Sequence, residues 1–254
     1  MINSKRIDIW HKINIIYKDK DFLILEKPSG LIVHPDKYQK DNTLVDWILD
    51  NYPEIKQVGE VSRQGLVHRL DKDVSGLMVI ARNKITYQYL IDQFKAHKVK
   101  KEYLALVFGT IYPFKGVIDF SIARNKKGKL VVLNSKNLIA SSFESNQQKV
   151  KNIKSAITEY EVIKEFQDFT LIKLKLLTGR TNQIRLHLKA MGCPIVGDKK
   201  YSTKESNNLV AKQKIDRIFL HAYCLGFYDS ENKWREFNNE LPKGLKVFID
   251  NLRS

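Results

Sequence analysis

Short runs of apolar residues, either continuous or alternating with polar ones, recur along this chain of 254 residues. Runs of this length and pattern predict β-strands. We expect strands at 13–17, 22–25, 77–81, 101–109, 116–123, 130–133, 155–162 and 169–177. Apolar residues at helical spacing predict helices elsewhere. One should begin at Thr43, in a capping box with Asp46, and end before Pro53; the others should cover 84–97, 181–192 with Thr181 as N-cap, and 243–252.

The stretch from Gly65 to Ala81 combines two apolar runs with a polar centre. Six polar or charged side chains lie within the eight residues from His68 to Ser75. This pattern predicts a strand, an exposed turn and a second strand, with the turn bringing its charges together. Turns on a rigid scaffold often carry chemistry. By composition alone, a solvated hairpin tip is an equally good interpretation.

The charge balance bears on the class of partner. The chain holds 44 Lys and Arg against 28 Asp and Glu, so its net charge is +16 and its pI is about 9.6. A basic excess of this size favours a polyanion, either nucleic acid or an anionic membrane surface. A general enrichment in lysine is the alternative explanation. Nucleic acid is the first expectation because Arg and Lys gather beside the polar turns.

Other features exclude several classes of protein. The two cysteines, Cys193 and Cys224, lack CxxC spacing, which favours buried free thiols over a metal site or a disulfide. Residues 1–12 lack the apolar core of a signal peptide, and no apolar run has the length of a membrane span, so we expect a cytoplasmic protein without membrane contact. No P-loop, GxGxxG, HExxH or GxSxG motif occurs. Residues 134–155, rich in Ser, Asn, Gln and Lys, are predicted to form a mobile surface loop.

Several stretches together resemble one known family. They read Glu-Lys-Pro-Ser-Gly-Leu-Ile-Val-His-Pro (26–35), His-Arg-Leu-Asp-Lys-Asp-Val-Ser-Gly (68–76), Lys-x-Tyr-x-Ala-x-Val-x-Gly (101–109), Thr-Gly-Arg-Thr-Asn-Gln-Ile-Arg (178–185) with Pro-Ile-Val-Gly-Asp (194–198), and Leu-His-Ala (220–222). In this order they resemble the RluA-type RNA pseudouridine synthases. The motifs span about 13–227, so we expect one catalytic domain over 1–254. The small N-terminal S4-type domain of many relatives is expected to be absent.

The resemblance implies a fold and a reaction. The fold is α+β, with a mixed, largely antiparallel central sheet that is flanked by helices and carries a catalytic cleft, which agrees with the predicted strands and helices. The enzyme is an isomerase that detaches the base of a uridine, turns it and rejoins it through C5 to give pseudouridine. This chemistry needs no redox step, so neither a cofactor nor a metal is expected. The implied partner is RNA, bound by a monomer.

The resemblance also assigns catalytic roles to three residues. Asp71 is the nucleophile, attacking the sugar or the base, and Asp73 is the neighbour that composition alone does not separate from it. Arg185 is the cation that keeps Asp71 ionised, with Arg180 as a competing candidate. Tyr103 offers a ring on which uracil stacks and a phenol that could assist proton removal from C5. The ordinary alternatives are a turn-capping Asp, a solvated helix Arg and a half-buried strand Tyr.

Further residues are expected to contact RNA: Arg69, His68, Lys101 and Arg180. The family's counterpart of Arg69 fills the space left by the flipped base, and a planar guanidinium stacks well on bases. His68 is also expected to pack beneath the turn rather than to act as a base. Lys27 and His34 could touch RNA, although a structural or merely exposed role is the first interpretation.

The chain departs from the family pattern at two positions. Val74 stands where Thr is usual, and Asn182 where His is usual. Neither is a proposed catalytic group, so we expect tuning of activity rather than its loss.

Three functions are weighed. An RNA pseudouridine synthase comes first, with large-subunit ribosomal RNA preferred over transfer RNA as the target. A non-catalytic RNA-binding or ribosome-assembly factor on the same fold would suit the charge and the two departures. A metal-dependent hydrolase would need a set of ligands whose spacing fits no standard pattern: His68, Asp71, His187 and Asp198.

Overall fold

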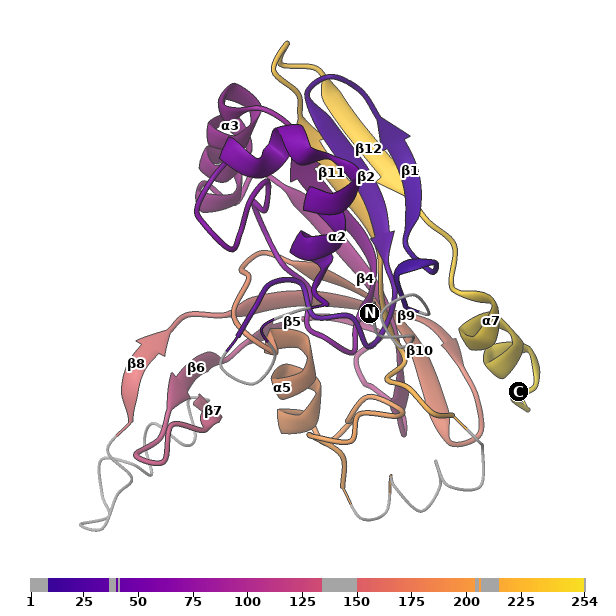
Figure 1. Cartoon of the computed structure of the whole chain (residues 1–254). Helices are drawn as coiled ribbons and strands as arrows, with labels where there is room; N and C mark the ends of the chain where they lie inside the picture. Colours follow the sequence, from indigo (N-terminus) through magenta and orange to yellow (C-terminus); the bar gives the residue numbers. More distant parts are fainter. Residues whose placement is uncertain are drawn as a thin grey trace. The chain divides into compact units, whose positions relative to one another are not determined.

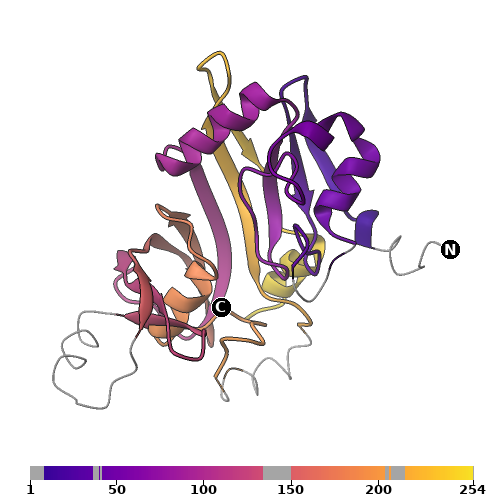
Figure 2. The ribbon, with the colours of Figure 1, turned by 60° about the vertical axis from the view of Figure 1, so that its left-hand side comes forward.

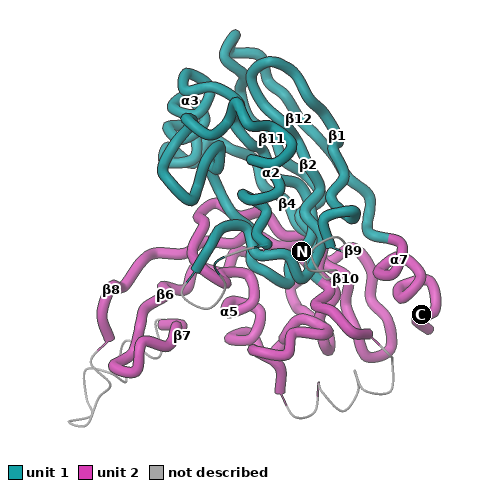
Figure 3. The backbone as a smooth tube through the Cα atoms, in the orientation of Figure 1, with its two compact units in different colours: residues 1–103, 220–242 teal, residues 104–219, 243–254 magenta. Residues whose placement is uncertain are grey.

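The computed structural model describes residues 9–36, 40, 42–133, 150–203, 206 and 215–253. The chain divides into two compact units (Figure 3). Unit 1 consists of Met1–Tyr103 and Leu220–Pro242, and unit 2 of Leu104–Phe219 and Lys243–Ser254. The expectation of one catalytic domain over the whole chain stays a prediction. Within the described residues, no helix is both long enough and apolar enough to cross a membrane.

Unit 1 is built on a mixed sheet (Figure 1). Its strands are β1 (Asn14–Lys18), β2 (Phe22–Lys27), β3 (Ser75–Ala81), β11 (Leu220–Tyr228), β12 (Trp234–Asn238) and the first part of β4 (Lys100–Phe108). The hydrogen-bonded order is β1-β2-β3-β11-β4, and β12 pairs with β11. The pairs β1/β2, β2/β3 and β11/β12 are antiparallel, whereas β3 and β11 run parallel.

Two predicted helices are confirmed in unit 1. Helix α2 (Leu44–Asn51) begins at Thr43, whose hydroxyl accepts the N–H of Asp46 while the Asp46 carboxylate accepts the N–H of Thr43. This is the predicted capping box, and it satisfies donors that the first turn of a helix leaves without partners. The short 3₁₀-helix η1 (Pro53–Gln57) follows. Helix α3 (Lys84–Lys95) is capped by Asn83 and packs against β3 (Figure 2).

The core of unit 1 follows the apolar runs. Every residue of β3 is buried, and so are Phe22 to Leu25 of β2. A continuously apolar strand suits the middle of a sheet that is covered on both faces. The Phe22 ring also meets the Phe227 ring edge to face, 5.2 Å between centroids. Burial of these side chains is the main favourable term in folding this unit.

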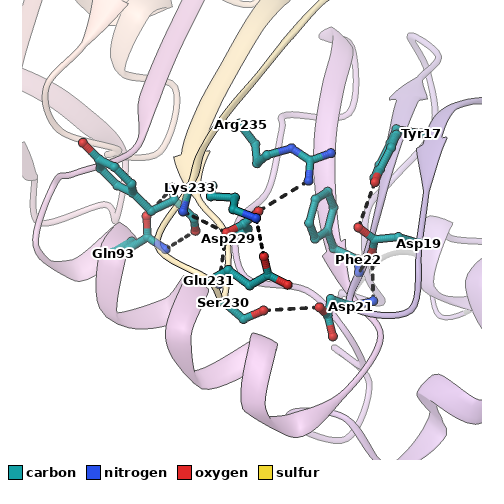
Figure 4. A network of polar contacts seen from close by, with 11 residues as sticks. Tyr17, Asp19, Asp21, Phe22, Gln93, Asp229, Ser230, Glu231, Lys233 and Arg235 are labelled. Atoms are coloured by element: carbon teal, nitrogen blue, oxygen red, sulfur yellow. Dashed lines mark hydrogen bonds and ion pairs between the residues drawn. The ribbon is translucent and has the colours of Figure 1, made fainter.

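Polar contacts join two turns at the ends of the unit 1 strands (Figure 4). Asp19 accepts the backbone N–H groups of Asp21 and Phe22, at 2.8 and 2.9 Å. Such side-chain acceptance is typical of Asp in turns. The Ser230 hydroxyl, in the β11–β12 turn, lies 3.3 Å from the Asp21 carboxylate. The turn between β1 and β2 is therefore tied to a turn that lies far away in the sequence.

Unit 2 holds two sheets. In the first, the end of β4 is followed by β10 (Phe169–Leu176), β9 (Ile157–Glu165) and β5 (Lys115–Asp119). β10 and β9 form the predicted antiparallel hairpin, and β5 lies antiparallel to β9. The second has the order β7 (Leu130–Leu133), β6 (Ser121–Arg124) and β8 (Lys151–Lys154). Helices α5 (Gln183–Ala190) and α7 (Lys243–Asp250) complete the unit.

The predicted α+β class, with a mixed and largely antiparallel sheet and flanking helices, is confirmed. Four local predictions are wrong in part. The strand expected over 116–123 is divided into β5 and β6, which belong to different sheets. Of the strand expected before the polar turn only one bridge forms, between Leu66 and Ile80, and 67–74 is an irregular loop. The N-cap of α5 is Asn182, in the left-handed region at φ 54°, and not Thr181. In the expected loop 134–155, residues 134–149 lie outside the described residues, whereas Lys151–Lys154 forms strand β8.

Candidate active site

The loop 67–74, which carries Asp71, is braced by a buried lysine. Lys27 is fully buried at the end of β2, and its ammonium group donates to the carbonyls of Pro28, Leu31 and Lys72 at 2.8, 2.9 and 3.0 Å. A buried charge is tolerated when it is fully hydrogen-bonded. Lys72 is the residue after Asp71, so Lys27 fixes the backbone beside the candidate nucleophile. The structural interpretation of Lys27 is confirmed.

The same turn makes further contacts with this loop. The backbone N–H of Gly30 donates to the carbonyl of Lys72 at 2.8 Å, and the Ser29 hydroxyl donates to the carbonyl of Asp73 at 2.6 Å. Two motifs that are separated by about forty residues in the sequence are therefore in direct contact in the folded chain. The Lys-Pro-Ser-Gly turn supports the loop that carries Asp71.

The Ser-Gly end of the polar stretch meets the Leu-His-Ala motif. The Ser75 hydroxyl and Nδ1 of His221 lie 2.8 Å apart, and both side chains are buried. Gly76 has φ +127°, and a Cβ there would lie 2.3 Å from the carbonyl oxygen of Ala222. Only glycine suits this backbone and this close approach of β3 to β11. The two strands therefore hold the end of the loop in a set position.

The surroundings separate the two carboxylates that composition left equal. Asp73 is exposed, whereas Asp71 is half-buried, and the carbonyl of Asp71 accepts the N–H of Val74 at 3.2 Å. The Val74 side chain is buried. A partly buried carboxylate on a braced loop is the better candidate for covalent or acid–base chemistry.

Tyr103 lies within the electrostatic reach of Asp71. Its side chain is buried on β4, and burial, followed by the negative charge of Asp71, raises the pKa of its phenol above the ordinary value. The phenol is therefore protonated at neutral pH. Such a group can stack and donate a hydrogen bond, whereas removing a proton as a base would require the phenolate.

His68 packs beneath the loop, as expected. Its Nε2 accepts the backbone N–H of Val79 at 3.0 Å, and its ring stacks on Phe94 with centroids 4.7 Å apart. Burial, with a smaller contribution from the Lys101 charge, lowers the pKa of His68 to about 3. The imidazole is therefore neutral at physiological pH, and the predicted contact of His68 with RNA stays a prediction.

Lys101 lies near the same ring. Its ammonium group is 5.9 Å from the centroid of Phe94, and burial lowers its pKa to about 8. A fraction of Lys101 is thus neutral at slightly alkaline pH, which weakens any contact with a phosphate there. Its role in binding RNA stays a prediction.

Arg69 is exposed on the loop, two residues before Asp71. Its Nη1 lies 2.7 Å from Nε2 of His34, and Nδ1 of His34 lies 2.9 Å from the carbonyl of Pro35. His34 is buried. The motif at 26–35 therefore contacts the side chain of Arg69 as well as the backbone of the loop 67–74.

In unit 2, Arg185 forms a buried ion pair with Asp198. Its Nε and Nη2 donate to the two carboxylate oxygens at 2.7 and 2.8 Å, and the side chains are 7% and 1% exposed. Its Nη1 donates to Oδ1 of Asn182 at 3.2 Å, and the guanidinium lies 5.0 Å from the centroid of Tyr201. This geometry fixes the plane of the guanidinium, because bidentate pairing allows one orientation.

Sequence reasoning missed Asp198 as a partner of Arg185 and considered it only as a metal ligand. The signal available was its place in the Pro-Ile-Val-Gly-Asp motif, 13 residues after Arg185. Asn182, the second departure from the family, holds its left-handed backbone and donates to the Tyr201 hydroxyl at 3.0 Å. Pairing of Arg185 with Asp71 stays a prediction. The competing Arg180 donates from Nε to the carbonyl of Ser155 at 3.0 Å.

Three of the four side chains of the metal-hydrolase alternative have other partners. Both oxygens of Asp198 accept from Arg185, Nε2 of His68 accepts from Val79, and Nε2 of His187 lies 3.1 Å from a backbone carbonyl. Among the described residues, no group of three or more His, Cys, Asp or Glu side chains could hold a metal ion.

Comparison with known proteins decides the family. Residues 21–190 match the model of the RNA pseudouridylate synthase family, which is more than half of the chain. The chain belongs to this family. The predicted resemblance is confirmed, and so is the prediction of an isomerase that converts uridine to pseudouridine in RNA.

Individual relatives agree with this assignment. An uncharacterized RNA pseudouridine synthase of Bacillus subtilis is 34% identical over 95% of this chain and 73% of the relative. A protein of Borreliella burgdorferi named ribosomal large subunit pseudouridine synthase D is 35% identical over 94% of this chain and 68% of the relative. Among solved structures, human RNA pseudouridylate synthase domain containing 1 has a TM-score of 0.72 at 26% identity, covering 93% of this chain and 87% of that one.

Proposed function

We propose that this pseudouridine synthase modifies large-subunit ribosomal RNA and that Asp71 is its nucleophile. The observation that carries the target is the name that three relatives share. Proteins of Borreliella burgdorferi, Buchnera aphidicola and Zymomonas mobilis, 33–37% identical to this chain, are each named ribosomal large subunit pseudouridine synthase D. Each match covers more than nine-tenths of this chain.

The surroundings of Asp71 support its role. Breaking the bond between uracil and ribose needs a carboxylate that is ionised, reachable and held still. Asp71 is half-buried on a loop whose next residue is tied to Lys27 and Gly30. In this proposal Arg185 pairs with Asp71 and keeps it ionised. The contacts with Asp198 and Asn182 hold the guanidinium of Arg185 in one plane.

Tyr103 has a narrower role in this proposal than the sequence suggested. The raised pKa of its phenol favours a neutral ring. We assign it to stacking against the detached uracil, because a base that has left its stack is stabilised on an aromatic face. Proton removal from C5 then falls to another group, and we assign it to Asp71, whose charge acts on Tyr103.

A basic surface in unit 2 suits an RNA backbone. The sheet of β6, β7 and β8, with the turn between β6 and β7, carries only basic charges: within 121–133 and 150–154 no Asp or Glu occurs. Its six cations are all exposed: Arg124, Lys126, Lys127, Lys129, Lys151 and Lys154. Phosphate contacts by such residues give affinity without sequence specificity and weaken with salt. We infer that this sheet binds RNA outside the target uridine.

Tritium release tests the reaction. Ribosomal and transfer RNA, each labelled at C5 of uridine, are incubated separately with the wild type, Asp71→Asn and Asp73→Asn. C5 loses its hydrogen to water only when the new carbon–carbon bond forms. We expect release from ribosomal RNA by the wild type and by Asp73→Asn, and none by Asp71→Asn. Release only from transfer RNA would overturn the target, and turnover by Asp71→Asn would overturn the nucleophile.

A further inference from the structure

The contact between Arg69 and His34 has defined proton positions. The carbonyl of Pro35 can only accept, so Nδ1 of His34, 2.9 Å away, carries the proton. Nε2 is then an acceptor, and the guanidinium of Arg69, which is always charged, donates to it at 2.7 Å. His34 is buried, whereas Arg69 is exposed. A buried, neutral imidazole thus holds one end of an exposed arginine.

We propose that His34 is a positioning residue that holds the Arg69 guanidinium on the catalytic loop for contact with RNA, and that it does so only while the imidazole is neutral. This inference rests on the proposed function of the loop. His34 does not touch the reacting atoms, and it acts through Arg69.

The physical reason is the cost of ordering an exposed arginine. A free Arg side chain loses rotamer freedom when it is fixed in one place. A hydrogen bond from the charged guanidinium to a buried acceptor offsets part of this entropy loss before RNA binds. His34 uses one of the five donors of Arg69, so the planar group keeps other N–H donors and both its faces for nucleotides.

The charges around His34 decide how the contact responds to acid. Burial opposes protonation most strongly, the hydrogen bond to the Pro35 carbonyl favours it, the charges of Arg69 and Arg63 oppose it and that of Asp36 favours it, so the pKa of His34 lies below its ordinary value. A proton on Nε2 would replace the acceptor with a donor facing a guanidinium. Protonation therefore releases Arg69, and the contact weakens as the pH falls through this lowered pKa.

The test is a double-mutant cycle. His34→Phe keeps a ring but removes the acceptor, and His34→Gln keeps an acceptor oxygen near the position of Nε2. Both are made in the wild type and in Arg69→Ala. Single-turnover tritium release is measured on total cellular RNA labelled at C5 of uridine, so that a rate is obtained whichever RNA is the target.

We expect His34→Phe to lower the rate about tenfold, as the loss of one charged hydrogen bond implies, and His34→Gln to stay within about threefold. Neither should lower the rate further in Arg69→Ala, because the partner is already gone. The wild-type rate should fall on the acid side, and that part of the pH profile should be absent in His34→Gln.

Two results would overturn the inference: equal losses from His34→Phe with and without Arg69, or an unchanged rate in His34→Phe. Urea unfolding of each variant excludes loss of fold as the cause. If the wild type releases tritium from transfer RNA alone, the proposed ribosomal target is wrong, but the rates of the double-mutant cycle can still be compared. If the wild type releases none, the same cycle is measured in RNA affinity, where additive losses reject the role of His34.

Discussion

Removing the negative charge of Asp198 tests what holds Arg185 in place. In Asp198→Asn the carboxylate becomes an amide of the same shape. One oxygen can still accept a hydrogen bond, whereas the new NH₂ group faces the guanidinium donors. Arg185 then lacks the opposite charge of Asp198 at a site where the two side chains are 7% and 1% exposed. The variant therefore isolates charge from volume.

The burial of the pair sets the magnitude. Removing one member of a buried pair costs about 3–5 kcal/mol, because the other charge stays desolvated. Since the amide keeps one acceptor, we expect the lower end, about 3 kcal/mol. Asp198 also accepts the backbone N–H groups of Lys200 and Tyr201 at 3.0 and 3.1 Å. The amide oxygen of Asn can accept these two hydrogen bonds in only one of its two orientations.

Urea unfolding followed by tryptophan fluorescence measures the effect. With a denaturant slope of about 3 kcal/mol/M, the midpoint should fall by about 1 M while the slope is unchanged. The matched control is Glu231→Gln. Its ion pair with Lys233 is as short, 2.6 Å, but the side chains are 66% and 70% exposed, so no measurable shift is expected. Equal midpoints for the two variants would refute the argument that burial, and not distance, decides the strength of these pairs.

Other perturbations have equally definite outcomes. Gly76→Ala should lower the free energy of unfolding by about 3 kcal/mol, because the new Cβ meets the Ala222 carbonyl and the backbone has positive φ; a fully stable variant in urea would contradict this. As the pH falls from 6.5 toward 3, His68 should destabilise the fold by up to about 1.4 kcal/mol per pH unit, because its folded pKa is lowered and only the unfolded chain binds the proton; His68→Gln should flatten that part of the stability profile. Tyr103→Phe should keep most of the turnover, and Tyr103→Ala should lose about tenfold to a hundredfold; equal losses in the tritium assay would reject stacking.

Local sequence patterns were sufficient for most elements of the fold. The continuous apolar runs became β2 and β3, the alternating ones became the β9–β10 hairpin, and Thr43 with Asp46 formed the predicted capping box. These signals act between residues that are close in the chain, within one helical turn or along one strand. The N-cap of α5 was mispredicted because Asn182 adopts a left-handed backbone, and Thr181 has the cap residue type without the cap position.

The site was predictable as a list of residues and not as a set of contacts. The motifs single out Asp71, Tyr103 and Arg185 as candidates from the sequence alone. They did not reveal that Asp198 forms an ion pair with Arg185, or that His34 lies within hydrogen-bond distance of Arg69. Composition left Asp71 and Asp73 equal, the family motif favoured Asp71, and the structure adds that Asp71 is half-buried whereas Asp73 is exposed.

The α+β class, the family and the candidate catalytic residues could all be predicted from the sequence alone, because apolar periodicity and short motifs lie in neighbouring positions. The partners of the candidate residues became visible only in the folded chain. Lys27 and Lys72 are 45 residues apart, and Ser75 and His221 are 146 apart. Such pairs form where strands and loops that are distant in the sequence lie side by side, and local sequence preferences do not predict these contacts. Burial then sets the strength of each contact, since desolvation makes a charge without its partner costly.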